Sequence, residues 1–213
     1  MARVPPLQRG DVPELEDAFQ PVEERMGFLP NSLLTMARRP EILRAAASLA
    51  QATRTGTVSR ELKELVALVA STAAGCRYCQ AHTASNATRL GAEAARIAHV
   101  WSYETSELFS PAERAALRLA HHAALVPNQA IEEDFEDVRR HFDDGEIVEI
   151  VAIVALFGFL NRWNDTMATD LELGPFTVAN EVIADAGWEP GKHGAPRTAA
   201  TLARPSPSTQ TST

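Results

Sequence analysis

The chain has 213 residues, of which 45% are hydrophobic and 23% charged. This composition is typical of an ordinary globular protein and excludes a wholly disordered chain or a coiled-coil rod. The length suits about one domain, which can bury a substantial core. Lys and Arg number 20 against 28 Asp and Glu, and the formal net charge of -8 argues against a protein that binds nucleic acid or anionic membranes.

Neither the N-terminus nor any apolar segment indicates export or membrane insertion. Residues 1–10 contain two prolines and no apolar run, so no secretory signal is predicted. The longest apolar stretch, residues 150–160, is far shorter than the ~20 residues that span a bilayer. We therefore expect a cytoplasmic protein.

Apolar residues recur at helical spacing along most of the chain, which predicts an all-α protein. Helices are expected at residues 40–55, 59–74, 76–90, from 111 onward, at 147–165 and at 176–186. Ser110, Pro111 and Glu113 give the clearest helix start, because they supply an N-cap, a first-turn proline and a capping-box glutamate. No segment alternates with a period of two, so no sheet is expected.

The composition changes after Trp188. Residues 190–213 are rich in Pro, Thr, Ser and Ala and have few large apolar side chains. Burial there cannot offset the entropy lost on ordering. We expect a single domain over residues 1–189, followed by a disordered tail over residues 190–213.

Two segments of the chain resemble one another at a shift of 85 residues. Residues 61–70 align with residues 146–155, and nine of the ten pairs are identical or exchange Leu for Ile. The same shift places residues 161–164 on residues 76–79. Two helices rich in Ala, Val and Leu can match by chance, but the shared glutamates and an aligned Arg-aromatic pair favour a duplicated helical unit, at residues 58–91 and 143–171.

The only two cysteines, Cys76 and Cys79, lie at the start of a predicted helix. Free N–H groups and the helix dipole stabilise a thiolate there and lower its pKa from about 8.5, so the pair indicates redox chemistry or metal binding. His82 lies one turn along the same face, where it can exchange a proton with a thiol. Glu64 lies on the preceding helix, and a bend at Gly75 would let its carboxylate orient His82.

Each of these residues also has a purely structural interpretation. The two cysteines could be small apolar core residues, His82 a helix-face histidine, and Glu64 a solvated helix residue. Tyr78 is interpreted as a packing residue. No chemistry is assigned to the remaining histidines, which are His99, His121, His122, His141 and His193.

Glu64, the Cys76–Cys79 pair, His82 and a glycine after the helix, Gly91, together resemble the active-site signature of the carboxymuconolactone decarboxylase superfamily, in its alkyl hydroperoxidase D-like, peroxidase-related branch. The resemblance covers residues 26–171. It implies an all-helical fold built from a duplicated helical unit, assembled into dimers, trimers or hexamers.

The resemblance also implies a function, the haem-free, thiol-dependent reduction of organic hydroperoxides. Cys79 would attack the peroxide and Cys76 would resolve the resulting sulfenic acid into a disulfide, while Glu64 and His82 relay the proton. A dithiol reductant protein must then reduce the pair, since two cysteines alone support one turnover. No metal and no cofactor besides this redox-active disulfide are expected.

One departure from the family pattern concerns the histidine. The pattern has three residues between the second cysteine and the histidine, whereas only Gln80 and Ala81 intervene here. His82 is therefore rotated by about 100° around the helix, which puts its direct contact with the Cys79 sulfur in doubt. Tyr78 also takes a position that holds a second histidine in some relatives.

Three other interpretations stay open. A zinc site would use Cys76, Cys79, His82 and Glu64, although this helical spacing is not that of ordinary structural zinc sites. Decarboxylation of a muconolactone, a lyase reaction, is the chemistry that names the superfamily, but that branch does not rely on a CxxC pair. A binding protein whose disulfide is only a switch would oxidise reversibly without turnover.

Overall fold

The computed structural model describes residues 2–194, and within that range the chain forms helices and no strands. This confirms the predicted all-α class. The α-helices are α1 (Glu16–Met26), α2 (Asn31–Met36), α3 (Pro40–Ala52), α4 (Arg60–Ala73), α5 (Arg77–Arg89), α6 (Ala94–Ala98), α7 (Pro111–Ala124), α8 (Glu132–Val138), α9 (Asp144–Met167) and α10 (Leu173–Val182). Short 3-10 turns lie at Arg9–Asp11, Pro13–Leu15, Val100–Ser102 and Gly191–His193.

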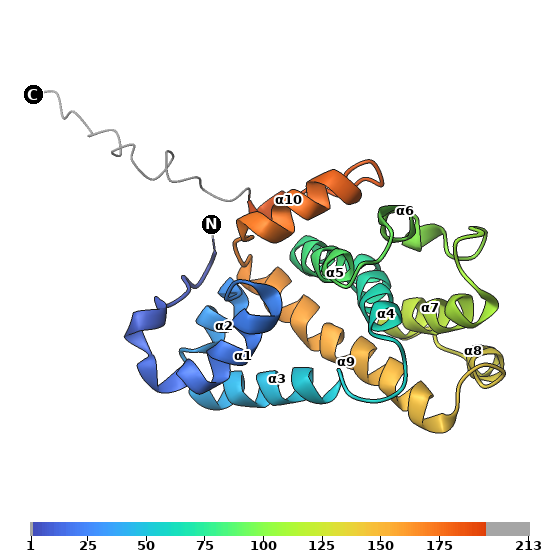
Figure 1. Cartoon of the computed structure of the whole chain (residues 1–213), viewed down its shortest axis with the longest axis horizontal. Helices are drawn as coiled ribbons and strands as arrows, with labels where there is room; N and C mark the ends of the chain where they lie inside the picture. The colour runs from blue at the N-terminus through green and yellow to red at the C-terminus, as the bar shows by residue number, and fades with distance from the viewer. Residues whose placement is uncertain (1, 195–213) are drawn as a thin grey trace, which may run out of the picture.

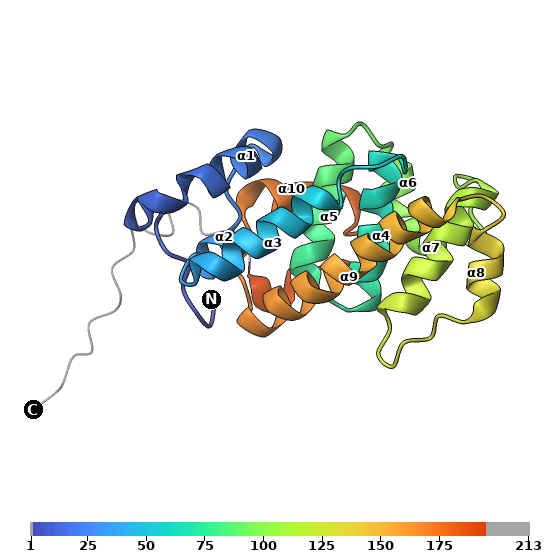
Figure 2. The same ribbon diagram turned by 90° about the horizontal axis from the view of Figure 1, so that it is seen from below.

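Helices α4 and α5 lie at the centre of the fold (Figure 1). Helix α4 packs against α5, α7 and α9, and α10 covers the side of α5 away from α9 (Figure 1). Helix α8 packs on α7 at one end of the molecule, and α1, α2 and α3 lie at the other end (Figure 2). No helix in the described range is both long and apolar enough to cross a membrane.

The predicted helices are all present, with small changes at their ends. Ser59 and Ser110 cap α4 and α7, because their side chains accept the backbone N–H groups of Leu62 and Glu113. Helix α10 begins three residues earlier than expected, at Leu173, and ends earlier, at Val182. The pattern did not predict α1, α2, α6 and α8, which are too short or too polar for a sustained apolar period.

In the part of the chain that the structure describes, the buried apolar side chains form two clusters. The larger cluster joins α4, α5, α7 and α9 and includes both cysteines. The smaller one packs α1 on α2 and α3, with Leu15, Phe19, Met36 and Leu43 at its centre. Leu160 of α9 contacts both clusters, so α9 joins the N-terminal helices to the rest of the fold.

The two copies of the suspected repeat differ at one turn. In the first copy Gly75, with a φ of 71°, separates α4 from α5. The shift of 85 residues places Leu160 at that position in the second copy, where α9 continues without a break. The positive φ favours glycine, and a leucine favours the continuous helix. The duplication itself stays a prediction.

The segment after Trp188 differs from the expected disordered tail in its first residues. Residues 191–193 form a 3-10 turn, and His193 is only 1% exposed. The Leu171 N–H donates to the His193 carbonyl, which attaches this turn to the end of α9. The expectation of disorder was therefore wrong for residues 190–194. The buried His193 side chain helps to order this segment, although its average composition is polar. The rest of that prediction, residues 195–213, lies outside the described residues.

Candidate active site

The two cysteines lie together where α5 begins. Cys76 is the N-cap residue, directly after the Gly75 turn, and Cys79 lies in the first turn of the helix. Both are free thiols, and their exposed fractions are 0% and 2%. The sequence-predicted pair is thus present at a helix N-terminus, inside the core.

The electrostatics of the pair are asymmetric. Hydrogen bonding to the Cys79 thiol lowers the pKa of Cys76; burial opposes this, and interaction with His193 adds to it. Burial raises the pKa of Cys79 well above its usual value, and the neighbouring Cys76 raises it further. Asn164 of α9 donates to the Cys79 sulfur at 3.5 Å. Cys76 is therefore the more acidic thiol of the pair.

His82 has a carboxylate partner that the sequence did not indicate. Its Nε2 lies 2.7 Å from an oxygen of Glu172, the residue that precedes α10. The imidazole also stacks on the Tyr78 ring, with 4.2 Å between centroids. His82 is therefore held in place by groups from α5 and α10.

Glu172 collects hydrogen bonds from three elements. Besides His82, the Tyr78 hydroxyl donates to it at 2.8 Å and the Asn31 N–H at 2.5 Å. Burial raises the pKa of Glu172, but the charge of His82 and these hydrogen bonds outweigh burial, so the net shift is downward. Glu172 is ionised at neutral pH and joins α2, α5 and α10.

Glu64 lies in a different cluster. Asn86 donates to one carboxylate oxygen at 3.3 Å, and Arg54 lies 3.5 Å from the other. Burial raises the pKa of Glu64, and Arg54 partly offsets that rise. The predicted relay from Glu64 to His82 is not formed, because the carboxylate bonded to His82 is Glu172. The predicted zinc set of Cys76, Cys79, His82 and Glu64 is likewise not gathered in one place.

His193 is a second residue that the sequence analysis missed. Its ring, Cys76 and Asp165 place one titratable atom each within 4.8 Å of one another. His193 is 117 residues from Cys76 in the chain, in a segment of low apolar content, and no local spacing signals their contact. Only the closed fold brings them together.

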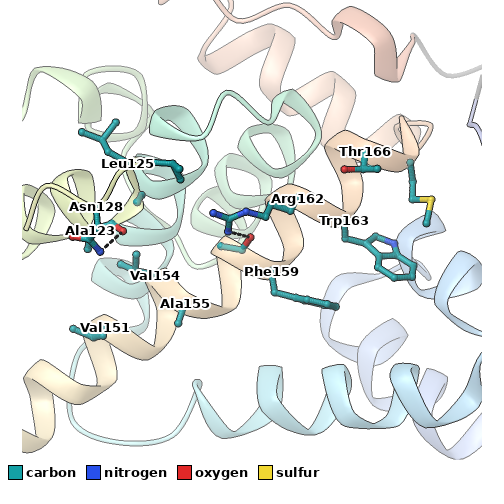
Figure 3. A pocket seen from close by; sticks show the side chains of 14 residues that line it. Ala123, Leu125, Asn128, Val151, Val154, Ala155, Phe159, Arg162, Trp163 and Thr166 are labelled. Atoms are coloured by element: carbon teal, nitrogen blue, oxygen red, sulfur yellow. Dashed lines mark hydrogen bonds between the residues drawn. The ribbon is translucent and has the colours of Figure 1, made fainter.

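An apolar hollow of about 880 Å³ lies on the outer side of α9, below the loop that follows α7. Figure 3 shows the side chains of Val151, Val154, Phe159, Arg162 and Trp163 from α9, and those of Leu125 and Asn128 from the loop. A smaller hollow of about 350 Å³ shares Leu125, Arg162 and Thr166 with it and reaches Asp165. The hollows therefore lead to a residue beside Cys76.

Comparisons with known proteins identify the family of this chain. The pattern of the Carboxymuconolactone decarboxylase family matches residues 40–122. The debrominase Bmp8, solved with 2,3,4-tribromopyrrole in a variant that has alanine in place of a cysteine, is 36% identical with a TM-score of 0.80, over 84% of this chain and 96% of that one. The chain belongs to the carboxymuconolactone decarboxylase superfamily, in its alkyl hydroperoxidase D-like branch.

Two uncharacterized proteins are also similar to this member of the superfamily. The alkylhydroperoxidase AhpD core of an uncharacterized peroxidase-related protein from Ralstonia eutropha JMP134 is 26% identical with a TM-score of 0.74, over 82% of this chain and 94% of that one. The uncharacterized protein YdfG of Bacillus subtilis (strain 168) is 28% identical over 126 residues, 59% of this chain and 84% of its own length. The superfamily contains enzymes, and membership supports an enzymatic role for this chain.

Proposed function

We propose that the chain is a dithiol-dependent reductase, in which Cys76 and Cys79 together transfer two electrons to a small organic hydroperoxide. The observation that carries this proposal is the buried pair of free thiols at a helix N-terminus, in which the pKa of Cys76 is lowered. A thiolate is the nucleophilic form of cysteine, and a second thiol beside it allows a disulfide to close. The similarity to the peroxidase-related protein from Ralstonia eutropha JMP134 supports the substrate class.

The proposed reaction has two steps. One thiolate attacks an oxygen of the hydroperoxide, the O–O bond breaks, and the leaving alkoxide takes a proton to become an alcohol. The resulting sulfenic acid is attacked by the other cysteine, and the S–O bond breaks as water leaves with the remaining proton. The pair ends as a disulfide, which an external dithiol protein returns to two thiols.

Two serine variants test this proposal. We expect the reduced protein to consume one equivalent of cumene hydroperoxide while both thiols become unreactive to Ellman's reagent and the mass falls by two hydrogens. With dithiothreitol present, turnover should continue in the wild type and stop in Cys76→Ser and Cys79→Ser. Full turnover in either variant would overturn the proposal.

A second substrate class is favoured by the likeness to Bmp8, which is stronger than that to the peroxidase-related protein. In this reaction a halogenated aromatic and two thiols would give the dehalogenated ring, a disulfide and hydrogen halide. The aromatic side chains of Phe159 and Trp163 in the hollow suit a flat, apolar substrate. Bromide release from 2,3,4-tribromopyrrole, measured in the same assay, distinguishes this class from hydroperoxides.

A further inference from the structure

His193 is held in one orientation by its own hydrogen bond. Its Nδ1 lies 2.8 Å from the Thr169 carbonyl oxygen. A carbonyl only accepts, so Nδ1 carries the proton, and in the neutral ring Nε2 is left with the free lone pair. Nε2 is buried and has no hydrogen-bond partner among the described residues. An imidazole with a fixed tautomer and an unused, buried lone pair is arranged to take up a proton.

The groups that face His193 come from three elements. Cys76 and the Tyr78 ring, whose centroid is 5.8 Å away, belong to the start of α5. The Asp165 carboxylate of α9 lies 3.8 Å from Nε2 and is also paired with Lys192, at 2.7 Å, in the same turn as His193. Of these, Tyr78 donates its hydroxyl proton to Glu172, which leaves the Cys76 thiol as the proton donor for the ring. Asp165 is an anion that stabilises a positive ring.

We propose that His193 is a catalytic residue that takes the proton of the Cys76 thiol through Nε2, so that Cys76 is the sulfur that attacks the substrate and Asp165 is the positioning residue that faces the charged imidazole. This inference rests on the proposed function and deepens it. It reverses the order of attack that the family resemblance implies.

This arrangement accounts for the proton that is transferred in the first step of the reaction. The Cys76 thiol gives its proton to Nε2 before the attack, leaving a thiolate and an imidazolium. When the O–O bond breaks, the imidazolium returns that proton to the leaving alkoxide, and His193 is neutral again. The Asp165 side chain is 40% exposed and lines the smaller hollow, so the group facing the imidazolium also contacts the route by which substrate would approach.

Within residues 2–194, no histidine forms a hydrogen bond with the Cys79 sulfur, and this supports the assignment. The nearest histidine along that helix, His82, uses its Nε2 to bind Glu172. The polar side chain that contacts the Cys79 sulfur is the Asn164 amide, which cannot accept a thiol proton at neutral pH. In the reduced protein, Cys79 is therefore suited to keep its proton until a sulfenic acid has formed on Cys76.

The test measures the ionisation of the Cys76 thiol and does not depend on catalytic turnover. In a Cys79→Ser background, the thiolate absorbance is titrated against pH in a chelating buffer, so that bound metal contributes nothing. His193→Asn retains a donor for the Thr169 carbonyl but removes Nε2, and we expect its titration to move toward that of free cysteine. A shift of one pKa unit corresponds to about a tenfold change in the ratio of thiolate to thiol at a given pH. His99→Asn, at an exposed histidine, is the matched control and should leave the titration unchanged.

Further measurements separate the possible outcomes. His193→Gln also removes the imidazole and keeps an amide donor, so it should shift the same titration in the same direction, and it remains informative if His193→Asn does not fold. A titration that neither variant moves would overturn the assignment of His193, even if the wild type reduces hydroperoxides. A shifted titration in a wild-type protein that reduces neither hydroperoxide nor bromopyrrole would uphold the proton transfer but contradict the proposed function.

Discussion

The Glu172 carboxylate is the centre of the hydrogen bonds around His82. It accepts hydrogen bonds from the His82 ring, the Tyr78 hydroxyl and the Asn31 backbone N–H. Glu172→Gln keeps the size of the side chain but removes the charge, and an amide nitrogen now faces one of these donors. We expect a loss of about 1–3 kcal/mol in the free energy of unfolding, measured with urea. Glu107→Gln, at an exposed position, should change it by less than about 0.5 kcal/mol.

The same carboxylate makes stability depend on pH in a defined direction. The pKa of Glu172 is lower in the folded chain than in the unfolded one, so its stabilisation is complete above the unfolded value of about 4.3. That stabilisation is lost as the pH falls through the folded pKa. The stability of Glu172→Gln should therefore fall less steeply with acid than that of the wild type. Parallel curves below about pH 4.3 would show that this carboxylate contributes nothing.

At the scale of helices, the turn between α4 and α5 positions the thiol pair, and Gly75 makes that turn possible. A Cβ built on Gly75 meets no other atom within 4 Å, so a substitution there costs only the strain of a positive φ. We expect Gly75→Ala to lower the free energy of unfolding by about 1–2 kcal/mol and Gly75→Asn to lower it by less.

A glycine with ordinary backbone angles provides the control for this strain. Gly158, inside α9, has no positive φ, and a Cβ built there meets the Arg162 side chain at an ordinary contact distance of 3.6 Å. Gly158→Ala should therefore leave stability unchanged or raise it slightly, since alanine favours the helix. Equal losses at both glycines would show that the left-handed turn is not the cause.

For the whole molecule, the outer face of α9 points to self-association, which the family resemblance also implies. Helix α9 is apolar on most sides, and Val148, Val151 and Phe159 are 67%, 38% and 39% exposed. They form an exposed apolar surface along α9, of the kind that another copy covers. We expect a homo-oligomer by light scattering and a smaller mass for Val151→Glu.

A matched variant distinguishes association through this surface from nonspecific hydrophobic association. Ile42 of α3 is 40% exposed and lies on another helix, so Ile42→Glu should leave the mass unchanged. A monomeric wild type would show that the prediction of an oligomer is wrong. An oligomer that Val151→Glu leaves intact would place the contact elsewhere.

The sequence by itself determined the helical class, six of the ten α-helices in residues 2–194, the thiol pair at a helix start and the superfamily. These features depend on residues within a few turns of one another, as in the Ser110 cap or the spacing of Cys76 and Cys79. Periodicity and capping are local properties, so they can be read along the chain.

The tertiary structure alone decided which groups meet the two sulfurs and His82. Glu172 replaces Glu64 as the partner of His82, and His193 reaches Cys76 from a segment expected to be disordered. Both contacts join residues 90 or more positions apart, and their geometry depends on how α10 and the following turn pack on α5. Hydrogen bonds between such distant groups leave no spacing in the sequence, because they follow from packing of the whole core and not from any single helix.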